Sequence, residues 1–111
     1  MLITHQETSD IIGIRVACQE NGVEVGRVRL YIFKNDAHEK PYGFLECVSV
    51  DDAYQGKGYG TALVQEVVHI ARARGCYKLV LTSRERNTHI HEWYRKQGFT
   101  EWGKEFRMDL E

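Results

Sequence analysis

The sequence has few of the features that mark specialised classes of protein. No apolar run approaches the roughly 20 residues that a membrane-spanning helix needs, so no membrane partner is expected. The formal net charge is only −1, which excludes the strong positive field of a nucleic-acid-binding protein. The N-terminal segment MLITHQETSD lacks the basic and apolar regions of a secretory signal.

Cysteine is also scarce. The three cysteines, Cys18, Cys47 and Cys76, are an odd number and lie far apart in apolar surroundings, which indicates reduced, buried residues rather than a disulfide framework. His89 and His91 are two apart on a predicted helix and therefore face different directions, and no Cys or carboxylate lies at zinc-ligand spacing. We therefore expect a cytoplasmic protein without a metal site.

The chain has one proline and no repeat, low-complexity tract or linker. Pro41 lies in KNDAHEKPYG, the most polar segment, which is expected to be a loop. Of the 111 residues, 42% are hydrophobic and 28% are charged. This length and composition are typical of one globular domain, so residues 1–111 are predicted to form a single domain.

Alternating apolar residues predict strands in the first half of the chain. The apolar side chains of 12–18 recur at every second position, and Asn21-Gly22 then gives the signal of a type I′ hairpin turn. A second strand is predicted over 23–33. The alternation of apolar and polar residues shifts by one position at Gly26, which predicts a β-bulge there. A third strand is predicted over 44–50.

The period changes to that of a helix over 59–74, and Gly75 is expected to end this helix. The apolar residues that share its buried face are Leu63, Val64, Val67, Val68 and Ala71. A buried strand is predicted over 77–83 and a second helix over 88–97. Asn87 is expected to cap the second helix, Gly98 to end it, and short closing strands are expected over 99–102 and 104–110.

This order of elements predicts an α+β fold, mixed in the direction of its strands. The step from 44–50 through the helix to 77–83 requires a right-handed parallel crossover. The hairpins at both ends of the chain imply antiparallel neighbours. We therefore expect a mixed, mostly antiparallel sheet with a central parallel β-α-β step and two main helices.

A glycine-rich turn over 55–60 separates the third strand from the first helix. The start of a helix has backbone N–H groups without partners and a partial positive charge, and glycines let a ligand approach them closely. The turn is therefore either a phosphate site, with Lys57 adding charge, or a plain tight turn. Its spacing fits neither a P-loop nor a dinucleotide motif, because Gly56, Gly58 and Gly60 are two apart throughout.

Two motifs resemble those of a known family. Residues 55–60 read Q-x-x-G-x-G behind a VSV strand, and residues 87–99 read N-x-x-I-x-x-W-Y-x-x-x-G-F. In this order, with one strand between the two helices, they resemble the GNAT superfamily of acyl-CoA-dependent N-acyltransferases. The resemblance extends over 44–99 and implies a GNAT-like fold with acetyl-CoA as cosubstrate.

The resemblance implies a set of coenzyme-binding residues. The amides of the turn hold the pyrophosphate of coenzyme A, and the strand before the turn pairs its backbone with the pantetheine arm. A bulge in that strand opens a slot for the thioester. The residues implied are Val48, Ser49, Val50, Gln55, Gly56, Lys57, Gly58, Tyr59, Gly60, Thr61, Asn87 and Tyr94.

Two residues are candidates for catalysis. The resemblance places Tyr94 beside the coenzyme sulfur, where its hydroxyl donates a hydrogen bond to the leaving thiolate; the alternative is a core aromatic residue beside Trp93. Glu46 is in phase with Val48, near where many GNAT members have a Glu that deprotonates the amine; the alternative is a strand carboxylate at the edge of the slot. Cys47 is expected on the opposite face from Glu46 and therefore not as a nucleophile.

Family members usually have two helices before the hairpin, which form one wall of the acceptor site. Only about ten residues precede Ile11 here, too few for two helices. Two functions stay open. The first is transfer of an acetyl group from acetyl-CoA to a primary amine of a small molecule, peptide or protein, by direct attack in a ternary complex. The second is a noncatalytic acyl-CoA-binding or protein-interaction module. A symmetric homodimer is expected at an apolar patch of Tyr31, Phe33, Tyr42 and Phe44; the alternative is a monomer with an open cleft that accepts a protein tail.

Overall fold

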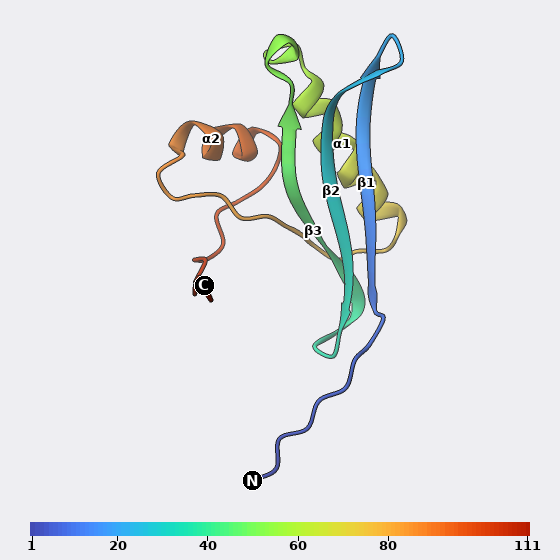
Figure 1. The fold of residues 1–111 in the computed structure, drawn as a ribbon, viewed down its shortest axis with the longest axis vertical. Helices are drawn as coiled ribbons and strands as arrows, with labels where there is room; N and C mark the ends of the chain where they lie inside the picture. The colour runs from blue at the N-terminus through green and yellow to red at the C-terminus, as the bar shows by residue number, and fades with distance from the viewer. The chain divides into compact units, whose positions relative to one another are not determined.

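In the computed structural model, which describes residues 1–111, a long β-hairpin follows ten exposed residues without helix or strand (Figure 1). The strands β1 (Ile11–Glu20) and β2 (Val23–Asn35) are antiparallel. Asn21 and Gly22 join them with φ values of 52° and 78°. A type I′ turn needs φ > 0 at both central residues, so the predicted turn is confirmed.

The predicted bulge in β2 is also present. Cys18 pairs with Gly26, but Gln19 pairs with Glu24, so Val25 is an extra residue on β2. A Cβ on Gly26 would lie 2.8 Å from the Sγ of Cys18 and 3.2 Å from the carbonyl oxygen of Ser49, so only glycine fits there. Because the bulge resets the alternation, apolar residues on both sides of it are buried.

The third strand is longer than predicted. β3 (His38–Val50) is antiparallel to β2, and a turn at Asp36 and Ala37 joins the two. The segment 34–43, expected to be a loop, is therefore mostly the exposed end of a hairpin. Pro41 is tolerated because the pairing is irregular there: Phe33 pairs with Tyr42 and Asn35 with His38, so Pro41, which has no N–H, has no partner in the ladder.

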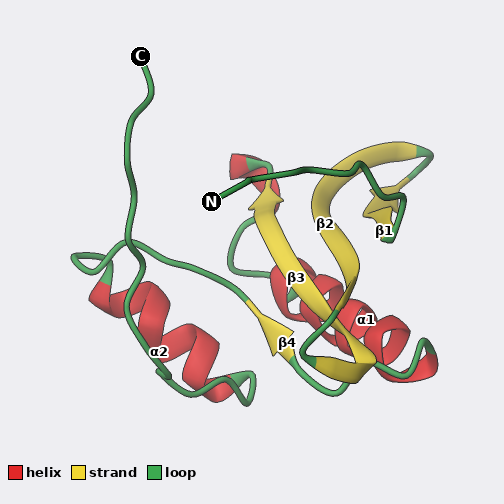
Figure 2. Ribbon diagram, turned by 90° about the horizontal axis from the view of Figure 1, so that it is seen from below, coloured by secondary structure: helices red, strands yellow, loops and turns green.

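The helix α1 (Tyr59–Ala73) covers one face of the sheet (Figures 1 and 2). Its buried residues lie on the predicted face. They complete a core of Val25, Val28, Leu30, Ile32, Leu45, Leu63, Val64, Val67 and Ala71. Gly75 ends the helix with a φ of 77°, and the amides of Gly75 and Cys76 donate to the carbonyls of Arg72 and Ala71, each at 3.0 Å. This is a Schellman motif, as the glycine predicts.

The strand predicted over 77–83 is present only as β4 (Leu79–Val80). It is parallel to β3, with Gly43 beside Leu79 and Phe44 beside Val80, and the sheet order is β1-β2-β3-β4 (Figure 2). The parallel β-α-β step and the predicted fold class are confirmed. The predicted length of the strand is wrong. Only Leu79 and Val80 pair with β3, and this pairing ends at Phe44, before the irregularity in β3 at Cys47.

Residues 1–80 and 81–111 form two compact units. In the second, α2 (Thr88–Lys96) is preceded by Asn87. The carbonyl of Asn87 accepts hydrogen bonds from Ile90 and His91, each at 3.1 Å, but its side chain makes no capping bond. Asn87 therefore occupies the predicted capping position without the predicted side-chain cap. Neither helix of the chain is long and apolar enough to cross a membrane.

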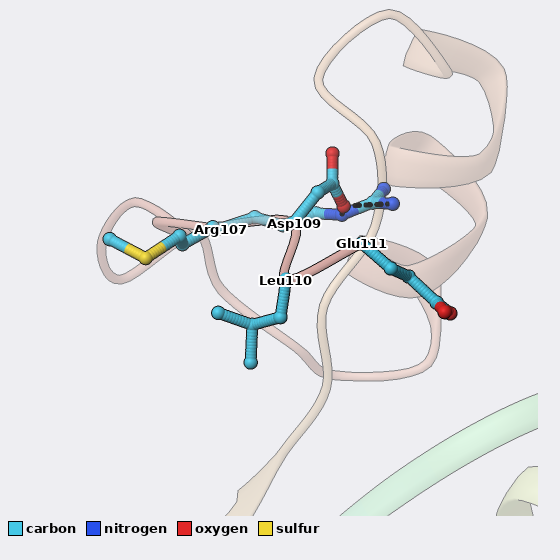
Figure 3. A pocket seen from close by; sticks show the side chains of 5 residues that line it. Arg107, Asp109, Leu110 and Glu111 are labelled. Atoms are coloured by element: carbon cyan, nitrogen blue, oxygen red, sulfur yellow. Dashed lines mark hydrogen bonds and ion pairs between the residues drawn. The ribbon is translucent and has the colours of Figure 1, made fainter.

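The closing strands predicted over 99–102 and 104–110 are not formed. The alternating apolar residues Phe106, Met108 and Leu110 are 92%, 81% and 89% exposed. Alternation shows that a segment is able to pair, but a strand forms only where an edge is available. A hollow in this tail lies between five consecutive residues, 107–111, where Arg107 and Asp109 form an ion pair (Figure 3). It is a feature of the tail and contains none of the predicted site residues.

Candidate functional site

The glycine turn lies where β3 passes into α1. After Val50, a single 3₁₀ turn, η1 (Asp52–Tyr54), leads to Gln55 and the glycines. Gly56 and Gly58 have φ values of 75° and 91°, which side-chain-bearing residues rarely adopt. A Cβ at either position would meet no protein atom within 4 Å. Packing therefore does not require these glycines; the backbone conformation requires them, and the space in front of them is open.

The start of α1 supplies donors to this open space. The first helical hydrogen bond runs from the amide of Ala62 to the carbonyl of Gly58 at 3.0 Å, so the N–H groups of Tyr59 and Gly60 precede it. No acidic residue lies in the first turn of the helix, and Lys57 adds a positive charge beside it. Unpaired amides, a helix N-terminus and a cation together favour an anion, and phosphate is the commonest one.

Gln55 holds the turn in place. Its side-chain Nε2 donates to the carbonyl of Val50 at 3.0 Å and to Oδ1 of Asp52 at 3.3 Å. Both side-chain N–H groups of Gln55 are thus engaged within the chain. Gln55, the first residue of the motif, thus stabilises the path of the backbone. Its side chain has no N–H donor left for a ligand.

The β1–β2 hairpin contacts both sides of the turn. The Tyr59 hydroxyl donates to Oε1 of Glu20 at 2.7 Å, and Nη1 of Arg27 lies 2.9 Å from Oδ1 of Asp51. The Nε of Arg27 also donates to Oε2 of Glu24 at 3.1 Å. The hydrogen bonds of Arg15 hold the pKa of Glu24 at about 2, with Arg27 adding to the effect, so this carboxylate is ionised at neutral pH and fixes Arg27.

β3 carries a bulge of its own before the turn. Arg29 pairs with Glu46 and Arg27 with Ser49, so two residues of β3, Cys47 and Val48, lie opposite one of β2. The φ of Cys47 is 61°, which is unusual for a residue with a side chain. The predicted bulge in this strand is therefore present. Beyond Phe44 the outer edge of β3 has no strand partner in its unit, and Val48, Ser49 and Val50 lie along that edge.

The bulge changes the predicted relation of two side chains. Cys47 was expected on the face opposite Glu46, and this is wrong: its Sγ lies 3.8 Å from Oε1 of Glu46. The positive φ at Cys47 interrupts the alternation of the strand, so both side chains turn to the same side. Both residues are exposed, and Cys18 and Cys76 are only partly buried, so the prediction of buried cysteines is wrong.

The sequence matches the acetyltransferase (GNAT) family over residues 4–99. The chain belongs to this family. It is 37% identical over 98 residues to a glucosamine 6-phosphate N-acetyltransferase of Trypanosoma brucei brucei, covering 86% of the chain and 65% of that protein. It is also 37% identical over 112 aligned positions to an aminoglycoside N(6′)-acetyltransferase type 1 of Stenotrophomonas maltophilia, covering 96% of the chain and 73% of that protein.

A solved structure of a Trypanosoma brucei acetyltransferase has a TM-score of 0.75 to this chain at 33% identity, covering 91% of the chain and 70% of the other. The GNAT chain thus spans about two thirds of the length of these relatives. The predicted family is therefore confirmed. GNAT members use acetyl-CoA as cosubstrate.

The second GNAT motif has a clear local structure. Gly98 ends α2 with a φ of 105°, and the amides of Gly98 and Phe99 donate to the carbonyls of Arg95 and Tyr94 at 3.0 and 3.1 Å. This Schellman motif brings the rings of Phe99 and Tyr94 into edge-to-face contact, with 5.8 Å between their centroids. The spacing Y-x-x-x-G-F therefore fixes the orientation of the Tyr94 ring at the end of the helix.

Tyr94 is half-buried, and burial raises its pKa. Its hydroxyl therefore stays protonated at neutral pH, and it makes no hydrogen bond within its unit. A protonated, unengaged phenol can donate a hydrogen bond but is a poor base. In the same unit, Asn87 stands just before α2 with its side chain free of a capping bond.

Sequence reasoning missed the hairpin residues that contact the turn. Glu20 and Arg27 looked like exposed strand charges, and nothing local distinguishes them. Their partners Tyr59 and Asp51 lie 39 and 24 positions further along the chain. No three or more His, Cys, Asp or Glu side chains are grouped so that they could hold a metal ion.

Proposed function

We propose that this chain transfers an acetyl group from acetyl-CoA to a primary amine of an aminated sugar, by direct attack in a ternary complex. The observation that carries the proposal is the turn of Gly56, Gly58 and Gly60, which opens backbone donors at the start of α1 to an anion. The choice of acceptor is supported by the two relatives that are 37% identical, whose names specify glucosamine 6-phosphate and aminoglycosides.

In this proposal each part of the site has one task. The amides of 56–61 bind the pyrophosphate of the coenzyme, with Lys57 adding charge. The outer edge of β3, at Val48, Ser49 and Val50, pairs with the pantetheine arm as an added strand. Tyr94 donates a hydrogen bond to the departing thiolate, and Asn87 contacts the coenzyme. For this the units 1–80 and 81–111 must act as the single domain 1–111.

Glu46 is proposed to accept the proton of the amine, directly or through water. The neutral amine then attacks the thioester carbonyl and forms the carbon–nitrogen bond, and the carbon–sulfur bond breaks. The thiolate leaves with the hydrogen bond from Tyr94, and the proton that the attacking nitrogen loses passes to the thiolate or to water. Glu46 is exposed on β3, next to the open edge, and pairs across the ladder with Arg29. Glu46→Gln is expected to lower kcat/KM by about 10²-fold, the lower end for a general base, which steady-state kinetics with a saturating acceptor measures.

The test of the proposed function is a panel of acceptors at fixed acetyl-CoA. Thiol release and the mass of the acetylated product are measured with glucosamine, glucosamine 6-phosphate, an aminoglycoside and a lysine peptide. N-acetylglucosamine, whose amine is blocked, is the control. We expect turnover with one of the three aminated sugars. Turnover of the peptide alone would contradict the choice of acceptor, and coenzyme binding without any transfer would support the noncatalytic module instead.

The expected homodimer remains a prediction. Tyr31, Phe33, Tyr42 and Phe44 alternate with core residues and so lie together on the face of the sheet away from α1. The rings of Phe33 and Tyr42 are stacked, with 5.2 Å between centroids. We propose that this patch contacts a second copy. Light scattering at micromolar concentration is expected to give twice the monomer mass, and a monomer mass would contradict the dimer. The three free cysteines support the proposed cytoplasmic location.

A further inference from the structure

The tip of the β1–β2 hairpin is tied to the first residue of α1. Glu20, the last residue of β1, accepts a hydrogen bond of 2.7 Å from the hydroxyl of Tyr59. This bond is the main reason that the pKa of Tyr59 is raised to about 12, so the hydroxyl is a donor at every physiological pH. The two residues are 39 positions apart, so only the fold brings them together.

Tyr59 stands between Gly58 and Gly60, the two glycines of the motif. Glycines expose the backbone to a phosphate, but they lose more conformational freedom on ordering than other residues do. A turn that is open enough to bind an anion is therefore costly to hold in one conformation. A side-chain tie on the residue between the glycines restricts that freedom without occupying the open space.

The Tyr59 ring is held from a second side. It lies edge-to-face with the ring of Tyr54, with 5.8 Å between centroids. The Nζ of Lys57 lies 5.7 Å from the centroid of the Tyr54 ring. A continuous set of contacts thus runs from Glu20 through two rings to the cation of the turn.

The same hairpin also holds the chain before the turn. Arg27 forms an ion pair of 2.9 Å with Asp51, and the amide of Asp51 donates to the carbonyl of Val25 at 2.9 Å. The segment from Asp51 to Tyr59 is therefore tied to one rigid element at both of its ends. The tie at Tyr59 is the one that sits among the anion-binding amides.

We propose that Glu20 and the Tyr59 hydroxyl are a positioning pair, which holds the first-turn amides of α1 in the orientation that binds the pyrophosphate of coenzyme A. This inference rests on the proposed function. Neither group reaches the reacting atoms, so the pair acts on binding of the coenzyme and not on the chemical step.

Tyr59→Phe removes one hydroxyl and keeps the ring. Loss of a hydrogen bond to a charged acceptor at an exposed site is expected to raise the KM for acetyl-CoA by about five- to tenfold and to leave kcat unchanged. With acetyl-pantetheine, a donor without a pyrophosphate, the KM is expected to stay the same. A merely structural loosening would affect both donors, so this comparison isolates the pyrophosphate.

The matched control is Tyr54→Phe, because the Tyr54 hydroxyl makes no hydrogen bond in the chain; its KM is expected to be native. Glu20→Gln keeps an oxygen that accepts the bond and is expected to be close to native. Glu20→Ala is expected to match Tyr59→Phe, and the double variant Glu20→Ala with Tyr59→Phe is expected to lose no more than either single variant.

Two results would overturn the inference. One is a native KM for acetyl-CoA in Tyr59→Phe with only the melting temperature lowered, which would make the tie structural. The other is an equal rise in KM for acetyl-pantetheine. Failure of the proposed function is a separate result, because there the wild-type protein itself transfers no acetyl group to any of the aminated sugars.

Discussion

Gly58→Val is expected to weaken coenzyme A binding by more than about 100-fold, to the point where calorimetry detects none. The φ of Gly58 is 91°, and a Cβ there would meet no protein atom within 4 Å. A side chain at this position therefore projects into open space beside the turn. If that space is the pyrophosphate site, the methyl groups of Val displace the phosphate and strain the turn at the same time.

The chain offers a matched control for the strain. Gly75, at the other end of α1, has a φ of 77° and equally open surroundings. Gly75→Val imposes the same kind of backbone strain and is expected to bind coenzyme A with native affinity. Gly58→Val combines two causes, displacement of the phosphate and strain of the backbone. Gly60→Val tests displacement without that strain, because Gly60 lies inside the helix and has no positive φ. Native affinity in a folded Gly58→Val and a folded Gly60→Val would refute the cradle.

Local signals predicted the elements that depend on local structure. The Asn21-Gly22 turn, the bulge beside Gly26 and the Schellman motif at Gly75 follow from residues within a few positions of each other. The buried face of α1 follows from a period of 3.6 residues. In each case the physical cause and the sequence signal occupy the same short segment.

The wrong predictions concern strands that need a distant partner. The apolar run 77–83 pairs over Leu79 and Val80 only, and 104–110 alternates but pairs with no strand. The polar segment around Pro41 is strand because its neighbour β2 continues, whatever its own polarity. The relation of Glu46 to Cys47 failed because strand alternation assumes a regular ladder, and the bulge removes it.

The candidate site likewise contains residues that a local motif predicts and residues whose role depends on distant contacts. The residues of the glycine turn were predicted from their motif, and the open positive-φ backbone at Gly56 and Gly58 is consistent with that prediction. The backbone amide of Gln55 was assigned to the coenzyme from the resemblance, and this stays a prediction; the motif did not indicate that its side chain donates to Val50 and Asp52. Glu20 could not be found at all, because its role depends on a contact with Tyr59 that the hairpin register creates.

The Tyr94 hydroxyl is expected to contribute to turnover and not to binding. Tyr94→Phe keeps the ring, and with it the edge-to-face contact with Phe99 that accompanies the end of α2. The fold of the second unit is therefore expected to survive. Only the donor to the leaving thiolate is lost. We expect kcat to fall by about 10²–10³-fold, the effect of one lost transition-state donor, with little change in the KM for acetyl-CoA.

The pH dependence of this loss distinguishes a donor from a base. Burial raises the pKa of Tyr94, so its hydroxyl is protonated throughout the range from about pH 6 to 9. A donor that never titrates in this range gives a ratio of wild-type to variant kcat that is constant with pH. A ratio that grows steadily with pH would instead indicate a phenolate acting as base. Tyr77→Phe, which removes a hydroxyl outside the site, serves as the control. Native turnover in Tyr94→Phe would instead leave Tyr94 with a purely structural role.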